Sequence, residues 1–274
     1  MKTDLLLIPF GADYASMRAA AVAAEESGFD GVWTWDHLQG GGAAGRAPVP
    51  ECWTLLTALA EATSRVTIGP LVLNAMNRDP GLVANMAATL QEVSEGRLVL
   101  GIGAGGSTKT PYAAEQLALG RPVPGDRVRR ERLVESIEVM RALWSGVGEY
   151  EGRHYQLQAA TGFMQPSVAP PIVVGGFGPK LAALAGTHAD GFNVPAQIPT
   201  MPELVATARA SHEESGRGGG FEVSAFTGLR ESYLRPDGAE RRYLQERDFD
   251  RLILLVDPPF DVESIREAGA LLLG

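Results

Sequence analysis

Residues 97–106 read Arg-Leu-Val-Leu-Gly-Ile-Gly-Ala-Gly-Gly, a short apolar run that leads directly into a cluster of glycines. Residues 170–178 repeat the pattern as Pro-Pro-Ile-Val-Val-Gly-Gly-Phe-Gly. Short apolar runs bounded by glycine are typical of buried strands. Glycine allows close approach of a ligand to the backbone, and backbone N–H groups before a helix can bind phosphate. The two stretches therefore predict strand ends that bind a phosphorylated ligand.

Strand-like and helix-like segments alternate on both sides of these stretches. Such alternation with short connections indicates parallel strands joined by right-handed crossovers. About eight strand–helix units predict an α/β fold of the (β/α)8 TIM barrel type, with a doubly wound open sheet as the alternative. No linker divides the chain, so we expect one domain over residues 1–274. The predicted strands are 5–9, 30–35, 66–73, 98–102, 172–174, 191–194, 221–227 and 252–256, and the predicted helices are 15–27, 51–63, 81–94, 126–144, 179–188, 202–215 and 262–272.

Composition excludes several classes of partner and site. The formal net charge of −9, with no basic stripe, argues against a nucleic-acid partner. No apolar run approaches the roughly 18 residues of a membrane span, and no signal peptide is evident, so we expect a cytoplasmic protein. The single cysteine, Cys52, cannot form an intrachain disulfide, and no HExxH or CxxC motif predicts a metal site.

Polar residues at two predicted strand ends, and a glycine-rich turn at a third, could carry chemistry. Asp36 and His37 end the second strand, where an imidazole and a carboxylate could contact a bound ring or substrate. The alternative is a histidine that caps local backbone. Asn74 follows the third strand, where its amide either points into the barrel mouth or forms an Asx turn. The turn at 175–178 is either a phosphate site or only a tight connection to the next helix.

Two longer connections follow predicted strands, at 39–50 and 104–125. Both would leave the carboxyl ends of strands, where barrel enzymes build their active sites. Their glycine content is consistent with mobile lids or with plain surface loops. Substrate contacts should come from these connections, but the sequence does not name the substrate.

Several stretches taken in order are similar to the luciferase-like monooxygenase family, especially its deazaflavin (coenzyme F420)-dependent branch. The resemblance implies a (β/α)8 barrel fold with a flavin or deazaflavin at the barrel mouth. The stretches that carry it include Ala-Glu-Glu-Ser-Gly-Phe-Asp-Gly-Val-Trp-Thr-Trp-Asp-His at 24–37, Ala-Ala-Thr-Leu-Gln-Glu-Val-Ser-Glu-Gly-Arg-Leu-Val-Leu-Gly at 87–101, Tyr-Glu-Gly-Arg-His-Tyr at 150–155 and Pro-Ile-Val-Val-Gly-Gly-Phe-Gly-Pro at 171–179.

The resemblance also implies roles for single residues. His37 matches the histidine near the reactive ring, with Asp36 fixing its orientation. Leu71 and Val72 match a position where many members carry a non-proline cis peptide bond. Some deazaflavin dehydrogenases carry a glutamate where this chain has Gly106, which makes the sugar-phosphate dehydrogenase type less expected here. The remaining cofactor contacts implied are Asn74 at the pyrimidine edge, Gly103, Gly105 and Gly106 beside the ring, and Gly175, Gly176, Phe177 and Gly178 at the phosphate.

The expected function is therefore that of an oxidoreductase that uses coenzyme F420, or failing that FMN, for hydride transfer to or from a small organic substrate. The resemblance also leads us to expect a homodimer. An FMN-dependent monooxygenase is the alternative within the family. A non-catalytic flavin-binding barrel and a barrel with an emptied site and an interaction role are alternatives from other classes.

Overall fold

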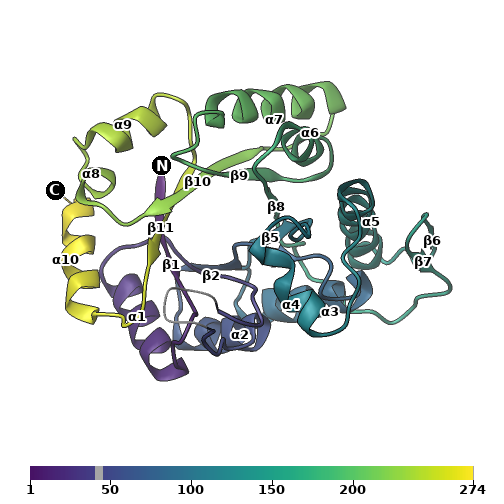
Figure 1. The fold of residues 1–274 in the computed structure, drawn as a ribbon, viewed down its shortest axis with the longest axis horizontal. Coiled ribbons are helices and arrows are strands. Elements are labelled where there is room, and N and C mark those ends of the chain that lie inside the picture. The colour runs from purple at the N-terminus through teal and green to yellow at the C-terminus, as the bar shows by residue number, and fades with distance from the viewer. Residues whose placement is uncertain (41–45, 274) are drawn as a thin grey trace.

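Parallel strands form a nearly closed barrel with helices packed around it (Figure 1). The computed structural model describes residues 1–40 and 46–273. The strand order is β3-β2-β1-β11-β10-β9-β8-β5-β4, and the parallel bridge between Ile68 and Leu98 brings the two edges of the sheet together. The barrel is confirmed, and the open sheet is excluded. The strands are β1 (Lys2–Leu7), β2 (Gly31–Thr34), β3 (Thr67–Pro70), β4 (Leu73–Asn74), β5 (Leu100–Gly103), β8 (Ile172–Gly175), β9 (Gly191–Pro195), β10 (Glu222–Gly228) and β11 (Arg251–Val256).

The helices fall close to their predicted positions. None of those in the described residues is long and apolar enough to cross a membrane. Cys52 is buried at the start of α2, and burial raises the pKa of its thiol. The helices are α1 (Tyr14–Glu26), α2 (Cys52–Ala62), α3 (Pro80–Val93), α4 (Ala114–Ala118), α5 (Asp126–Trp144), α6 (Pro179–His188), α7 (Met201–Ser215), α8 (Glu231–Leu234), α9 (Ala239–Gln245) and α10 (Val262–Leu273).

Alternation along each strand divides the apolar side chains between two layers. In β1, Leu5 and Leu7 pack in the large cluster shared with the helices, whereas Leu6 belongs to a smaller cluster with Trp33 and Ile253. Successive side chains of a strand point to opposite faces, so one face of each strand meets the helices and the other fills the barrel. The core therefore has an outer layer and an interior layer.

A buried ion pair lies among the interior residues of β1, β2 and β11. Asp4 accepts a hydrogen bond from Trp33 Nε1 at 2.7 Å and pairs with Arg251, which also contacts Glu222 at 2.8 Å. Asp4 is fully buried, and burial raises the pKa of its carboxyl although Arg251 acts in the opposite direction. Asp4 and Arg251 lie near the amino ends of their strands, so this cluster lies at the end of the barrel away from the strands' carboxyl ends.

One predicted strand and one predicted connection differ from the structure. The expected strand 66–73 is split into β3 and β4 at the peptide bond between Leu71 and Val72, which is cis, as the resemblance implied. The connection 104–125 contains a 3₁₀ turn, η1 (Pro111–Ala113), and α4, so it is partly helical rather than a plain loop. Of the connection 39–50, residues 41–45 lie outside the described residues. An antiparallel hairpin of β6 (Tyr150–Glu151) and β7 (Gln156–Leu157) projects beside α5 (Figure 1).

Candidate active site

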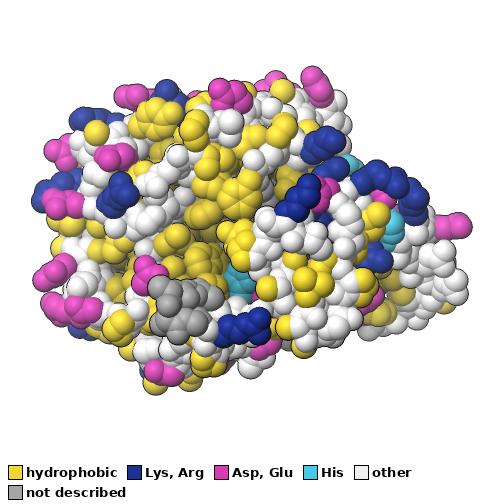
Figure 2. All heavy atoms as spheres, in the orientation of Figure 1, with side chains coloured by type: hydrophobic (Ala, Val, Ile, Leu, Met, Phe, Trp, Pro, Cys, Tyr) yellow, Lys and Arg dark blue, Asp and Glu magenta, His cyan; other side chains and the backbone are white. Residues whose placement is uncertain are grey.

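A cavity of about 610 Å³ opens at the carboxyl ends of the strands. This volume lies within the range of small-molecule and cofactor sites, roughly 300–1,000 Å³. Hydrophobic side chains gather around a hollow near the centre of the face in Figure 2, beside a histidine. Most of the predicted site residues are brought together here. Asp36, His37, Leu71, Val72, Asn74, Gly103, Gly105, Gly106, Gly175, Gly176 and Phe177 line the cavity, whereas Gly178 does not.

The glycines at the strand ends are packed against the protein's own atoms. A Cβ on Gly103 would lie 2.7 Å from Val72 Cγ2, and a Cβ on Gly175 would lie 2.7 Å from Val72 Cγ1. Real Cβ atoms essentially never show contacts under 3.0 Å, so Val72 fits between β5 and β8 only because both strands carry glycine. These glycines were interpreted as positions of ligand approach. Packing against Val72 by itself explains why both positions are glycine. Their backbone atoms still line the cavity.

Gly106 is required by the turn that follows it. A Cβ at this position would lie 2.5 Å from the Cβ of Tyr112 and 2.9 Å from the amide nitrogen of Ala113. Tyr112 therefore lies where any side chain of residue 106 would begin. A larger side chain at position 106 could not be accommodated unless this turn moved.

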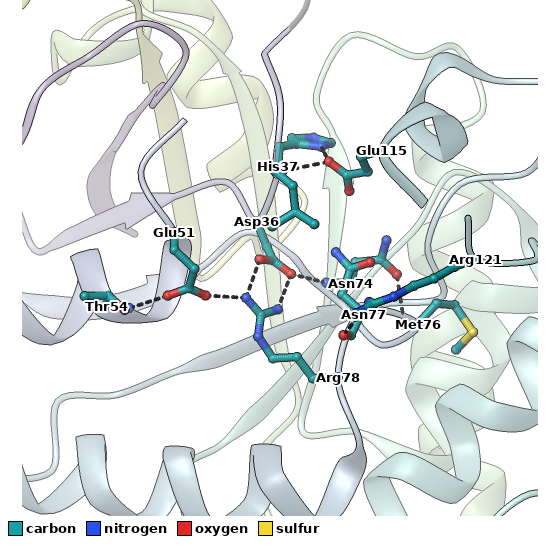
Figure 3. A network of polar contacts seen from close by, with 11 residues as sticks. Asp36, His37, Glu51, Thr54, Asn74, Met76, Asn77, Arg78, Glu115 and Arg121 are labelled. Carbon is teal, nitrogen blue, oxygen red and sulfur yellow. Dashed lines mark hydrogen bonds and ion pairs between the residues drawn. The ribbon is translucent and has the colours of Figure 1, made fainter. Parts of the chain in front are cut away.

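Asp36 is held by a cation and a backbone amide rather than by the histidine beside it (Figure 3). Its two oxygens accept hydrogen bonds from Arg78 at 2.7 and 2.9 Å, and one also accepts from the Asn74 amide at 2.9 Å. Arg78 also contacts Glu51, which caps the first turn of α2. Burial alone would lower the pKa of Arg78, but the two carboxylates raise it. The expectation that Asp36 orients His37 is wrong, because both of its oxygens serve Arg78 and Asn74.

His37 is held instead by Glu115 from α4 (Figure 3). Glu115 Oε2 lies 3.3 Å from His37 Nδ1 and accepts a hydrogen bond from the Leu38 amide at 2.8 Å. Glu115 is only 4% exposed. Burial acts to raise the pKa of its carboxyl, but the bonds from His37 and Leu38 outweigh it and lower the pKa. A carboxylate only accepts hydrogen bonds, so this contact favours a hydrogen on Nδ1 and leaves Nε2 for a ligand.

Aromatic rings surround His37 on the cavity side. The centroids of the Phe10 and Trp35 rings lie 5.5 and 6.2 Å from that of the imidazole. The Tyr112 ring lies 6.2 Å away and nearly parallel to it, at 24°. We call Phe10, Trp35, His37 and Tyr112 the aromatic recess. It joins the ends of β1 and β2 to the turn before α4.

Asn74 combines the two roles that its sequence position allowed. Its Oδ1 accepts a hydrogen bond from the Met76 amide at 2.9 Å, which forms the predicted Asx turn. The side chain also lines the cavity, and its NH2 group is left to donate to a ligand.

Two arginines of α5 line the cavity, and the sequence analysis missed both. Arg129 donates to the carbonyl oxygens of Ala104 and Gly105 and pairs with Asp126 at 2.7 Å, so it fixes the chain after β5. Among the described residues, Arg130 makes no ion pair. Its charge is therefore available to an anionic ligand.

The predicted phosphate turn offers fewer donors than expected. The Gly176 amide donates to the Asn193 carbonyl at 3.2 Å, and Pro179 at the start of α6 has no N–H. Gly178 precedes α6 without lining the cavity. Across the described residues, no group of three His, Cys, Asp or Glu side chains could hold a metal ion.

The sequence analysis also missed Tyr112 and Glu115. Both lie in the connection 104–125, which was interpreted as glycine-rich. Residues 111–119 read Pro-Tyr-Ala-Ala-Glu-Gln-Leu-Ala-Leu, which begins with proline and continues with strong helix formers. This pattern could have predicted a short helix. Its pairing with His37, 78 residues earlier in the chain, has no local signal.

Comparison with known proteins agrees with this architecture. An F420-dependent glucose-6-phosphate dehydrogenase from Nakamurella multipartita is 37% identical over 260 residues, covering 90% of this chain and 73% of that protein. One from Microbacterium testaceum is 40% identical over 174 residues, or 62% of this chain. That match spans 49% of the relative, about half of its length.

Solved structures share the fold over the whole chain. An F420-dependent secondary alcohol dehydrogenase in complex with an F420–acetone adduct superposes with a TM-score of 0.82 and 21% identity, covering 99% of this chain and 98% of that one. The coenzyme F420-dependent tetrahydromethanopterin reductase from Methanopyrus kandleri gives 0.79 and 19%, with the same coverage. The model of the luciferase-like monooxygenase family matches residues 5–242. The chain belongs to the luciferase-like monooxygenase family.

Proposed function

We propose that this protein is an oxidoreductase that binds the deazaflavin coenzyme F420 at the barrel mouth and transfers a hydride between it and a small organic substrate. The observation that carries the proposal is one cavity lined by three features: the Val72 side chain next to the cis peptide bond, the side-chain amide of Asn74 and the imidazole of His37. The F420-dependent relatives in sequence and in structure support the same assignment.

The cavity fits the parts of this cofactor. The apolar side chain of Val72 offers a surface for one face of a flat ring. The free NH2 group of Asn74 can donate to a carbonyl oxygen at the pyrimidine edge. The phosphate would be held by Arg130 together with the turn at 175–177, which both line the cavity. When bound, the deazaflavin supplies the hydride chemistry, while the protein orients the ring and the substrate.

His37 provides the proton chemistry that a hydride transfer to or from a carbon–oxygen bond requires. With Glu115 on Nδ1, the Nε2 atom can take a proton from a substrate hydroxyl or return one to a carbonyl oxygen. Glu115 holds the imidazole in position and compensates the positive charge that the imidazole gains. Asp36 acts indirectly: it accepts a hydrogen bond from the backbone amide of Asn74 and so fixes the position of that residue.

Titration of the purified protein with F420 and, separately, with FMN tests the proposal by quenching of cofactor or protein fluorescence. We expect F420 to bind at least tenfold more tightly than FMN. Loss of the amide donor in Asn74→Ala should weaken F420 binding by about two- to tenfold, since one hydrogen bond contributes about 0.5–1.5 kcal/mol. Binding of neither cofactor would contradict the proposal.

Tighter binding of FMN would favour the alternative, an FMN-dependent monooxygenase. A non-catalytic flavin-binding barrel would be indicated if His37→Ala left both cofactor binding and the cellular phenotype unchanged. The homodimer and the cytoplasmic location stay predictions.

A further inference from the structure

We propose that the substrate side of the cavity accepts an uncharged molecule with a flat, largely apolar body and a single hydroxyl or carbonyl group, and that Tyr112 sets this preference. The inference rests on the proposed function and names the substrate class for the same site. It sets this chain apart from relatives whose names specify a sugar phosphate.

The first argument is the surface that surrounds the proton-handling group. Within the aromatic recess, His37 is flanked by Phe10 and Trp35 from the first two strand ends, and their rings lie 5.3 Å apart. The Tyr112 ring lies nearly parallel to the imidazole, with its centroid 6.2 Å away. These rings offer dispersion contacts to a flat apolar body, whereas a charged group placed among them would lose water without gaining a partner.

The second argument is the number of cations available. Among the described residues that line the cavity, only Arg129 and Arg130 are Lys or Arg. Arg129 is committed to two carbonyl oxygens and to Asp126. A phosphorylated cofactor and a phosphorylated substrate together need two anion sites. Arg130 can serve only one of them, and the proposed function assigns it to the cofactor's phosphate.

Two of the other segments at the barrel mouth carry no cation. Residues 196–200, after β9, and residues 257–261, after β11, contain no lysine or arginine. The second of these segments contains two aspartates. A substrate phosphate beside the segment after β11 would therefore meet like charge rather than opposite charge.

The third argument is the linkage between Gly106 and Tyr112. A side chain at position 106 would overlap the backbone and Cβ of Tyr112. This overlap leaves no room for a side chain at position 106, so of these two positions Tyr112 alone contributes a side chain to the cavity. This wall of the cavity is therefore aromatic.

The reaction for this substrate class balances with groups already assigned. The deazaflavin, when bound, would accept the hydride that an alcohol carbon loses with its two electrons, and His37 Nε2 would take the hydroxyl proton. The product is the corresponding ketone or aldehyde, and the reverse reaction takes the hydride and the proton back. The deazaflavin is the only oxidant required.

Binding of acetophenone and of glucose 6-phosphate tests the inference, measured by calorimetry or ligand-observed NMR on F420-loaded and on cofactor-free protein. We expect acetophenone to bind at least tenfold more tightly than glucose 6-phosphate. Tyr112→Ala should weaken acetophenone binding by about two- to tenfold, the worth of one aromatic pair. Tyr112→Phe, which keeps the ring, should retain most of the affinity. Tyr243→Ala is the matched control, because Tyr243 lies on α9 under Arg247 and does not line the cavity.

Tighter binding of glucose 6-phosphate would overturn the inference, as would acetophenone affinity that is equal in wild type and Tyr112→Ala. The proposed function fails separately, if F420 does not bind. In that case acetophenone binding to cofactor-free protein still decides whether the recess selects apolar molecules.

Discussion

Replacement of Glu115 by glutamine should slow hydride transfer while leaving cofactor binding in place. Glutamine keeps the shape and can still accept hydrogen bonds from His37 and Leu38 through its amide oxygen, but it carries no charge. A hydrogen bond to a charged group contributes about 1.5–3 kcal/mol and a neutral one about 0.5–1.5 kcal/mol. The difference of roughly 1–1.5 kcal/mol applies when His37 takes up a proton. It corresponds to a decrease of about 5- to 13-fold in kcat.

The assay is turnover of F420-loaded enzyme with 1-phenylethanol, run beside a fluorescence titration that gives the Kd for F420. The matched control is Glu131→Gln, because Glu131 also contacts a histidine, His154, at 2.9 Å, but His154, unlike His37, does not line the cavity. We expect the control to change neither quantity. A kcat within twofold of wild type in Glu115→Gln would refute the positioning role, and a parallel loss of F420 affinity would show that Glu115 supports the cavity rather than the imidazole.

Three further predictions concern stability. Arg251→Met leaves the carboxylate of Asp4 buried without its cation and should lower the free energy of unfolding by about 3–5 kcal/mol in urea denaturation; a loss under 1 kcal/mol would contradict the buried pair. Gly103→Ala should cost about 1–3 kcal/mol by overpacking against Val72, and Val72→Ala in the same chain should recover part of that loss, which a double-mutant cycle measures. Glu115 has a lowered pKa, so its contribution is present above the carboxyl's unfolded-state pKa and is lost as the pH falls through the lowered value. The stability difference between wild type and Glu115→Gln should therefore shrink from pH 6 to pH 3, and a constant difference would refute this coupling.

The fold follows from short-range patterns in the sequence. Apolar runs that end in glycine marked the strands, and helix 126–144 was predicted at its observed bounds from apolar residues at helical spacing. Each segment reports its own periodicity, and β-α alternation leaves few ways to connect parallel strands. The break in the third strand was not predicted. The family resemblance located only the cis peptide bond between Leu71 and Val72, at which the strand breaks.

Part of the cavity could be predicted for the same reason. The carboxyl ends of parallel strands meet at one end of a barrel, so His37, Asn74 and the strand-end glycines had to lie near one another once the barrel was predicted. Their partners could not be predicted in this way. Asp36 is adjacent to His37 in the chain and was assigned to it, yet it serves Arg78.

The sequence by itself determined the barrel, the end at which the cavity lies and the strand-end residues that line it, because these depend on local periodicity and on general rules of strand connection. Only the tertiary structure decided that Glu115 holds His37 and that Tyr112 takes the space beside Gly106. It also decided that Arg129 is hydrogen-bonded to backbone carbonyl oxygens, whereas Arg130 makes no ion pair with any described residue. These contacts are made by the connection after β5 and by the start of α5. They depend on hydrogen bonds and packing between residues whose positions follow no periodic pattern in the sequence. Residue 106 is glycine because the Cβ and backbone of Tyr112 occupy the space that a side chain would need. The carboxylate that contacts the imidazole is that of Glu115, which lies on the short helix α4.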